Sequence, residues 1–449
     1  MNRPTRIAFL SEHASPLAPL GGADAGGQNI YVGEVSWGLG RLGYAVDVFT
    51  RRDSSAMPEI VEWVPGVRVV HLSAGPEQPR PKDELWPYMS EFRDSLLHFM
   101  ERDETHYDLV HGNFWMSGWV ATEVRRRLGI PVVQIFHAMG KTKRRHQKKV
   151  DTSPGERIKT ELDVIREVDR IIAQCPHERY ELVNDYGADP DKVVLIPSAV
   201  NTKLFKPVAR DEARRRIGLD TNGKVIVYVG RMLPRKDIRN IIRALAVLVR
   251  KNESVKDSLL LLVVGGESVE PDPVATPEIG ELQKLAAELG VSDHVRFIGR
   301  RQPEVLRDYY SAGDVAVTTP WYEPFGLTPL EAMACGRPVI GSAVGGITYT
   351  IKDGETGFLV PPHDPEALAT RLQQLLSQPE LCKRMGLAAR KRIEREFTWS
   401  IVAMRTGALY ETLLAERVYE PLPVETSSIA SFPTTSENAS LGGVDFGTR

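Results

Sequence analysis

Short, uninterrupted apolar runs alternate with helical segments along most of this chain, once in each half. Apolar runs of this length are typical of parallel strands that helices cover on both faces. The strands predicted in the first half are Arg6–Leu10, Ala45–Thr50, Val67–Leu72, Leu109–His111, Val132–Phe136, Arg170–Ala173 and Val193–Ile196. Those predicted in the second half are Val225–Val229, Leu259–Val264, Val295–Ile298, Val315–Thr318 and Val339–Ile340. The pattern predicts an α/β protein with two doubly wound, Rossmann-like domains.

The alternation pauses between Pro197 and Asp211. We therefore predict a first domain over residues 1–205 and a second over 206–398. Residues 399–418 are predicted to form a long amphipathic helix, and residues 419–449, rich in Ser, Thr, Gly and Pro, to be disordered. Ligands of doubly wound sheets bind beyond the carboxyl ends of the strands, so we expect the two domains to face a shared cleft.

Composition and charge narrow the classes of function. Apolar residues make up 42% and charged residues 26% of the 449, which is ordinary for a globular protein. The net charge of −2 argues against general nucleic-acid binding. Cys175, Cys335 and Cys382 are widely spaced, which favours reduced thiols, and no apolar run has the length of a signal peptide core or a transmembrane helix. We expect a cytoplasmic protein, whose oligomeric state the sequence does not indicate.

The segment Glu323–Glu331 combines two carboxylates with a predicted helix start. Pro324 and Gly326 favour a non-helical entry, and a short apolar helix is predicted from Leu327 to Gly336. The free N–H groups and partial positive charge of a helix N-terminus suit a phosphate, while carboxylates accept hydrogen bonds from hydroxyl groups. This layout fits a nucleotide sugar, which has phosphates in its middle and hydroxyl-rich groups at both ends.

A glycine-rich turn, Gly21–Asn29, follows the first predicted strand. Its four glycines, Gly26 and Gly27 among them, let the backbone approach a phosphate or sugar just before a helix predicted over Gln28–Leu42. The spacing is not that of the dinucleotide-binding fingerprint. A tight structural turn is the alternative interpretation.

Two cations follow the first strand of the second half, within Val229–Asp237. Arg231 lies at the carboxyl end of the strand and Lys236 is expected to open the next helix, so both are predicted to point into the cleft. Together they suit a departing diphosphate, because arginine can bind two oxygens and lysine supplies a point charge. A solvated cation pair is the alternative.

Two histidines of the first half, His111 and His137, end predicted strands. Each is interpreted either as a support for the core or as a ligand contact. The basic run Lys141–Lys149 is interpreted as a solvated helix face, as a peripheral contact with an anionic membrane or a partner, or as a phosphate pocket. Asp189–Asp191 lies in an ordinary turn, and no His/Cys cluster has metal-ligand spacing, so no catalytic metal is predicted.

Three of these motifs together resemble those of retaining glycosyltransferases of family 4, which have the GT-B fold. Glu323–Glu331 is similar to the E-x7-E motif of the family, Gly230–Lys236 to its G-R-x-x-x-x-K pattern, and Asp24–Val32 to its glycine-rich loop. The loop is most like those of sucrose-phosphate synthases and D-inositol-3-phosphate glycosyltransferases. The resemblance covers residues 5–418 and implies that the helix at 399–418 crosses back onto the first domain.

The resemblance also implies roles for individual residues. Catalytic roles fall to His137, Arg231, Lys236 and Glu323. The donor is expected to contact Gly26, Gly27, Phe297, Ile298, Gly299, Phe325, Gly326, Leu327 and Glu331. The acceptor is expected to contact Gln28, Asn29, Lys82, His111, Lys141 and Arg157, of which the three cations would meet a phosphate. The run Lys143–Lys149 is more basic than the family pattern, which leaves the acceptor open.

The predicted function is metal-independent, retaining transfer of a sugar from a nucleoside-diphosphate sugar, UDP- or ADP-linked, to an acceptor hydroxyl. The acceptor can be a sugar phosphate or an inositol phosphate, and no cofactor is required. The leaving phosphate is expected to assist deprotonation of the acceptor, and domain closure to exclude water. A hexosamine-nucleotide epimerase and a non-catalytic sugar-nucleotide sensor are the alternatives. Intact Arg231, Lys236 and Glu323 favour the transferase over the sensor.

Overall fold

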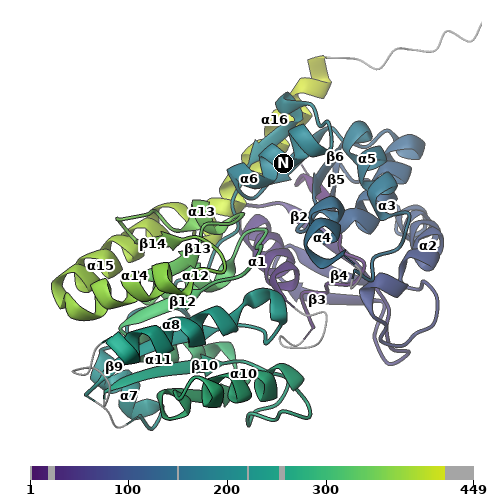
Figure 1. The fold of residues 1–449 in the computed structure, drawn as a ribbon. Helices are drawn as coiled ribbons and strands as arrows, with labels where there is room; N and C mark the ends of the chain where they lie inside the picture. Colours follow the sequence, from purple (N-terminus) through teal and green to yellow (C-terminus); the bar gives the residue numbers. More distant parts are fainter. Residues whose placement is uncertain (1–2, 19–25, 149–150, 220–221, 252–257, 420–449) are drawn as a thin grey trace, which may run out of the picture.

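The computed structural model describes residues 3–18, 26–148, 151–219, 222–251 and 258–419. The chain forms two α/β lobes, the first in purple to teal and the second in green (Figure 1). The first lobe carries strands β1–β8 and the second carries β9–β14. The prediction for the tail at 419–449 lies outside the described residues, except for Tyr419 at the end of the last helix.

The first lobe is built on an eight-stranded sheet in the order β3-β4-β2-β1-β5-β6-β7-β8. Its strands are β1 (Arg6–Leu10), β2 (Ala45–Arg51), β3 (Ile60–Val64), β4 (Val67–Leu72), β5 (Leu109–Asn113), β6 (Val132–Ile135), β7 (Arg170–Ala173) and β8 (Val193–Leu195). All neighbouring strands are parallel except β3 and β4. The central strands β5 and β6 are buried along their whole length, as expected for a sheet covered on both faces.

The second lobe has a six-stranded, fully parallel sheet in the order β11-β10-β9-β12-β13-β14. Its strands are β9 (Lys224–Val229), β10 (Leu259–Val264), β11 (Val295–Gly299), β12 (Val315–Thr318), β13 (Val339–Ser342) and β14 (Gly357–Val360). The strand order reverses between β9 and β12. In sheets of this kind, such a reversal is where ligands bind.

Helices cover both faces of each sheet, and each sheet therefore separates two apolar cores. The first lobe has α1 (Gly27–Arg41), α2 (Met89–Arg102), α3 (Phe114–Leu128), α4 (Gly140–Gln147), α5 (Arg157–Glu167) and α6 (Pro176–Tyr180). The second lobe has α7 (Arg210–Arg216), α8 (Ile238–Lys251), α10 (Pro277–Glu288), α11 (Pro303–Ala312), α12 (Leu327–Ala334), α13 (Ile347–Thr350), α14 (Pro365–Ser377) and α15 (Pro379–Glu396). The doubly wound α/β architecture predicted from the sequence is confirmed.

Every strand predicted from the sequence is confirmed, with ends that differ by at most two residues. The sequence pattern does not predict β3 and β14. Strand β3 lies at the sheet edge, runs antiparallel to β4 and has no fully buried residue, so it lacks a continuous apolar run. Strand β14 has only four residues and begins at a glycine, which is too short a signal to separate from a turn.

The last described helix, α16 (Trp399–Tyr419), follows the second lobe in the chain but packs on the first. In Figure 1 it is the yellow helix that runs beside α6. Tyr410 Oη lies 2.5 Å from His111 Nδ1 at the end of β5, and Tyr44 Oη donates a hydrogen bond of 3.2 Å to the Gly407 carbonyl. The end of the described chain is thus bound to the first lobe by buried polar contacts. Within the described ranges, no helix has both the length and the apolarity that crossing a membrane requires.

Candidate active site

The crevice where the second sheet reverses its strand order brings two of the predicted residues together. Arg231 follows β9, and Glu323 follows β12, the neighbouring strand. Both strands are parallel, so their carboxyl ends lie at the same edge of the sheet. Arg231 is exposed, and no hydrogen bond joins its guanidinium to another described residue. The guanidinium is therefore available to a ligand that enters the crevice.

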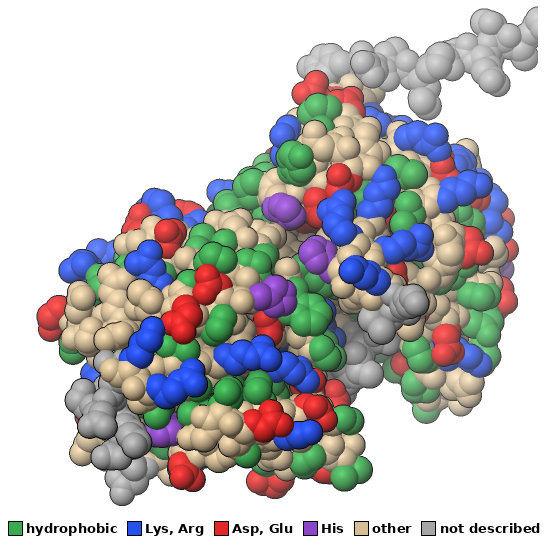
Figure 2. Space-filling view, in the orientation of Figure 1, with side chains coloured by type: hydrophobic (Ala, Val, Ile, Leu, Met, Phe, Trp, Pro, Cys, Tyr) green, Lys and Arg blue, Asp and Glu red, His purple; other side chains and the backbone are tan. Residues whose placement is uncertain are grey.

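A cavity of about 540 Å³ lies at this crevice between the two lobes. Residues that line it from the first lobe include Lys82, Phe114, Met139, Arg157 and Glu178, and those from the second include Arg231, Arg235, Tyr322, Glu323 and Thr348. Figure 2 shows histidine and cationic side chains along the boundary between the lobes on the face in view. A ligand in this cavity would contact a wall from each lobe, and both walls carry cations.

Lys236 forms an ion pair with Glu323, and both side chains are mostly buried. The expectation that Lys236 opens the next helix is wrong: Lys236 ends a 3-10 turn, and α8 begins only after Asp237, which takes a left-handed φ of 50°. Burial by itself would raise the pKa of Glu323, but Lys236, Arg235 and Arg231 hold the pKa of that carboxyl below its ordinary value. Glu323 is thus a carboxylate at neutral pH and can accept hydrogen bonds from hydroxyl groups.

Helices α1 and α12 begin next to each other, although they belong to different lobes. Gly326 precedes α12 with φ 93° and ψ 90°, a conformation that favours glycine. A Cβ atom on Gly27 would lie only 3.2 Å from Leu327 Cδ1, so the first residues of the two helices are in contact. The first N–H groups of both helices have no partner within the helix, which suits a phosphate. The Phe325 side chain packs in the core, which leaves its amide as the group for the predicted contact.

Glu331 lies in α12 beside the crevice but does not line the cavity. It accepts a hydrogen bond of 2.7 Å from Tyr310 Oη. Burial raises the pKa of Glu331 to about 7, although the Tyr310 hydrogen bond acts in the opposite direction. A ligand hydroxyl could join or replace this contact, and the ribose role of Glu331 stays a prediction.

Phe297, Ile298 and Gly299 end β11 at the edge of the second sheet. Gly299 has a φ of 79°, and a Cβ there would overlap the Val269 backbone, so the close approach of this loop requires glycine. These three residues do not line the cavity. Their predicted contact with the base of the donor stays a prediction.

His111 is buried and His137 is partly buried beneath the first-lobe wall, and neither ring lines the cavity. His111 stacks on Phe9, and burial lowers its pKa to about 3. Burial also lowers the pKa of His137 to about 3, so both rings are neutral at neutral pH. His137 Nε2 lies 3.1 Å from Asn113 Oδ1, and its φ of 61° is unusual for a residue with a side chain. His111 is thus a buried contact of Phe9 and Tyr410, while His137 follows β6 in a strained conformation close to the cavity wall. The ligand contacts predicted for both histidines stay predictions.

Gln28 and Asn29 lie in the first turn of α1, where polar contacts hold them. Asn29 Oδ1 accepts a hydrogen bond of 3.0 Å from the Gly26 amide, and Asn29 Nδ2 donates to the Ser15 carbonyl. Gln28 Nε2 donates to Ser11 Oγ at 3.4 Å. These contacts shape the start of α1, and the preceding loop residues 19–25 lie outside the described structure.

The three cations predicted to meet an acceptor phosphate differ in position. Lys82 and Arg157 line the cavity. Lys141 does not: its ammonium group donates to the Asp185 carbonyl and lies 4.6 Å from the centre of the Tyr186 ring. The helical periodicity of α4 places neighbouring positions of the basic run, and not Lys141, toward the cavity.

Sequence reasoning missed several residues of the cavity. Arg235 and Tyr322 line it from the second lobe, and each is the direct neighbour of a motif residue in the chain. Their side-chain directions depend on turn geometry, so the motifs alone could not assign them. Glu178 lines the opposite wall, where it accepts a hydrogen bond of 2.7 Å from the Gln174 amide. Burial raises the pKa of Glu178 to about 7.

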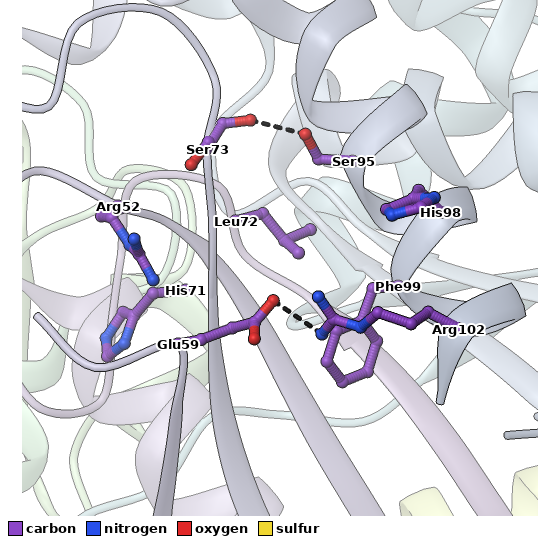
Figure 3. A pocket seen from close by; sticks show the side chains of 9 residues that line it. All are labelled: Arg52, Glu59, His71, Leu72, Ser73, Ser95, His98, Phe99 and Arg102. Atoms are coloured by element: carbon purple, nitrogen blue, oxygen red, sulfur yellow. Dashed lines mark hydrogen bonds and ion pairs between the residues drawn. The ribbon is translucent and has the colours of Figure 1, made fainter. Parts of the chain in front are cut away.

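A second, smaller cavity of about 320 Å³ lies within the first lobe, between α2 and the ends of β2 and β4 (Figure 3). Figure 3 shows two contacts beside it: Arg102 pairs with Glu59 at 2.7 Å, and Ser95 Oγ donates to the Ser73 carbonyl at 2.7 Å. This cavity shares no lining residue with the cavity between the lobes, and it contains none of the predicted site residues.

Comparisons with known protein families match both lobes. Residues 25–204 match the family described as Glycosyltransferase Family 4, and residues 209–392 match the one described as Glycosyl transferases group 1. A D-inositol 3-phosphate glycosyltransferase of Streptomyces scabiei is 39% identical over 91% of this chain and 91% of its own length. One of Kribbella flavida is 38% identical over 92% of this chain and 97% of its own length.

Solved structures show the same arrangement of lobes. A sucrose-phosphate synthase from Thermosynechococcus elongatus is 34% identical, covers 92% of this chain and all of that chain, and has a TM-score of 0.81. Anabaena HepE, solved in complex with UDP and glucose, is 17% identical, covers 90% of this chain and 99% of that chain, has a TM-score of 0.67 and shares the fold. The GT-B fold predicted from the sequence is confirmed.

Proposed function

Since the chain belongs to glycosyltransferase family 4, we propose that it transfers a sugar from a nucleoside-diphosphate sugar to a hydroxyl group of a phosphorylated acceptor, with retention of the anomeric configuration. The donor is a UDP- or ADP-sugar, and the acceptor is an inositol phosphate or a sugar phosphate. Relatives at 38–39% identity are D-inositol 3-phosphate glycosyltransferases, and a sucrose-phosphate synthase shares the fold at 34% identity, which supports this choice of acceptor class.

One observation carries the proposal: groups suited to a diphosphate converge at one edge of the second sheet. Arg231 reaches this edge from β9, and the ion pair of Lys236 with Glu323 reaches it from the neighbouring strand ends. Helix α12 begins at Leu327, four residues after Glu323, and its start contacts the start of α1 at Gly27. Two cations and two helix starts suit the charge that grows on a leaving diphosphate.

The proposed reaction needs no covalent nucleophile. The bond between the anomeric carbon and the diphosphate oxygen breaks, the acceptor oxygen bonds to the same face of that carbon, and the acceptor proton passes to the leaving phosphate. Arg231 and Lys236 stabilise the negative charge of the diphosphate, and Glu323 accepts a hydrogen bond from a hydroxyl of the donor sugar. The reaction requires no metal ion, because these cations and amides take the place of one.

The remaining assignments follow from the resemblance to the family. Glu331, in α12, would accept hydrogen bonds from the ribose, which supplies partners for a carboxyl held with a pKa near 7. His137 would face the donor sugar at the end of β6, where its unusual backbone conformation is held by the contact with Asn113. Lys82 and Arg157, on the first-lobe wall, would meet the phosphate of the acceptor.

A donor and acceptor screen tests the proposal. UDP-, ADP- and GDP-sugars are combined with inositol phosphate, hexose phosphates and their unphosphorylated forms, and products are identified by mass. We expect a phosphorylated glycoside to form with a UDP- or ADP-sugar, with the same yield in EDTA, and NMR of the product to show a retained anomeric configuration. Binding of the nucleotide without transfer to any acceptor would instead support a sugar-nucleotide sensor.

A further inference from the structure

Arg235 is a cation of the cavity that the motif residues do not include. It lies in the 3-10 turn Pro234–Lys236, between the two cations assigned to the diphosphate. Its guanidinium lies over the ring of Tyr322, 5.2 Å from the ring centre. Its Nη1 atom is buried and has no hydrogen-bond partner among the described residues. A buried donor without a partner costs about 1–3 kcal/mol, so the site favours a ligand that supplies an acceptor.

Two cations of the first-lobe wall, Arg157 and Lys143, already have carboxylate partners in their own lobe. Arg157, almost fully buried, donates through Nε to Glu161 at 2.8 Å, and its other donors reach Ser153 Oγ and the Ala138 carbonyl. Lys143 Nζ lies 3.2 Å from carboxylate oxygens of both Asp83 and Asp151. An anion that bound to either cation would have to compete with a resident carboxylate.

The second-lobe wall has fewer resident carboxylates than cations. Glu323 is the one acidic residue that this lobe contributes to the cavity lining, and it is paired with Lys236. Arg231 and Arg235 also line the cavity, and no carboxylate lies in ion-pair distance of either among the described residues. The proposed diphosphate would use Arg231 and Lys236, and this leaves Arg235 with no carboxylate at ion-pair distance among the described residues.

The Tyr322 ring, over which Arg235 lies, is itself in contact with the first lobe. The Tyr322 ring stacks on His146 of α4, with ring centres 4.6 Å apart and planes 18° apart. Tyr322 Oη also accepts a hydrogen bond of 2.7 Å from Gln147 Nε2. Arg235 therefore lies against a ring that two residues of the first lobe hold in place. An anion at the Arg235 guanidinium would lie between the two lobes, in the cavity that Lys82 and Arg157 line from the first lobe.

We propose that Arg235 binds the phosphate group of the acceptor from the second lobe, and that Tyr322 positions its guanidinium. The acceptor would then be held by both walls, because Lys82 and Arg157 face the same cavity from the first lobe. Arginine suits this role, since its planar group can bind two phosphate oxygens at once. The inference rests on the proposed function and adds a residue that determines preference for phosphorylated acceptors.

The test compares Arg235→Gln with the wild type and with Arg243→Gln, which removes an exposed cation from α8 outside the cavity. Transfer from UDP- or ADP-sugar is measured with inositol phosphate and with inositol. We expect Arg235→Gln to raise the KM for inositol phosphate about 10-fold to 100-fold and to leave the KM for inositol unchanged. Arg235→Lys should recover part of the loss, and Arg243→Gln should behave as the wild type. Equal effects on both acceptors would overturn the proposal.

Calorimetry measures binding without turnover, so it can test the role of Arg235 separately from the proposed transfer reaction. Inositol phosphate is titrated into protein saturated with UDP, and UDP is titrated into the free protein. We expect Arg235→Gln to weaken binding of inositol phosphate by the same factor and to change the Kd for UDP less than twofold. A matching loss of UDP affinity would assign Arg235 to the diphosphate instead. Arg235-dependent binding without any transfer would sink the proposed function and keep this inference.

Tyr322 gives a second, independent variant. Tyr322→Leu removes the ring that supports the Arg235 guanidinium but leaves the charge in place. We expect its KM for inositol phosphate to rise by a smaller factor than that of Arg235→Gln, and its preference for phosphorylated over plain acceptor to fall in proportion. An unchanged preference in Tyr322→Leu, together with a full effect in Arg235→Gln, would remove the positioning role of Tyr322.

Discussion

The two walls of the interlobe cavity differ in whether their arginine and lysine side chains are paired with carboxylates. On the first-lobe wall, Arg157 and Lys143 are held by carboxylates of their own lobe. On the second-lobe wall, Arg231 and Arg235 have no resident carboxylate partner among the described residues. A paired cation mainly fixes the shape of the wall, whereas an unpaired one gains a partner when a ligand arrives. The cations of the first wall thus have their partners before a ligand binds, whereas those of the second wall gain a partner when it binds.

The largest expected effect is on stability and tests the first wall. Arg157→Ala should lower the free energy of unfolding by about 3–5 kcal/mol, because it leaves the buried Glu161 carboxylate without its partner. Arg231→Ala is the matched control on the second wall, and it should change stability by less than about 0.5 kcal/mol because Arg231 is exposed. Urea denaturation measures both. Equal stability of the two variants would contradict the contrast between the walls.

The next effect is on turnover and tests the second wall. Lys236→Ala should lower kcat about 100-fold to 1000-fold, because it removes a charge that stabilises the leaving diphosphate. The protein should stay folded but lose stability, because Glu323 loses its ion-pair partner. The circular dichroism spectrum and Tm of the variant serve as the control for folding. Near-normal transfer by Lys236→Ala would remove Lys236 from the proposed mechanism.

A smaller effect concerns the pH dependence of stability. Burial raises the pKa of Glu331 to about 7, above its unfolded value of about 4.5, so its favourable contribution is present below the unfolded pKa and is lost as the pH rises through 7. Relative to Glu331→Gln, the wild type should lose about 3 kcal/mol between pH 4.5 and pH 7.5. Thermal unfolding of both proteins across this pH range measures the difference in stability.

Glu178→Gln is the matched variant on the first wall, since burial raises the pKa of Glu178 to about 7 as well. It should show the same pH dependence, but only Glu331→Gln should also raise the KM for the donor. If the donor KM changed in both variants, or in neither, Glu331 would not be the one carboxyl group of the two that contacts the donor.

The smallest expected effect is on the attachment of α16 to the first lobe. Tyr410→Phe removes the hydroxyl that lies 2.5 Å from His111 Nδ1 and should cost about 1 kcal/mol of stability. Because both groups lie behind the first wall, KM for donor and acceptor should stay within twofold. A change in KM much larger than the change in stability would mean that this buried contact sets the geometry of the cavity.

The sequence predicted all strands of the two sheets except β3 and β14, because most of the buried strands contain an apolar run, a signal that depends only on local composition. The edge strand β3, which is half exposed, gave no such signal. The motifs likewise predicted Arg231, Lys236 and Glu323 as neighbours, since strand ends of a parallel sheet meet at one edge. These features follow from short stretches of chain, so the sequence alone was enough.

Only the tertiary structure decided which side chains face the cavity and which are already paired. Lys141 is directed to the Asp185 carbonyl, away from the cavity, while Arg235 is held over Tyr322 within it. His111 is a buried partner of Tyr410, 299 positions further along the chain. Each outcome depends on helix phase and on contacts between distant segments. Such contacts form only when the whole chain has folded, so no local pattern in the sequence could specify them.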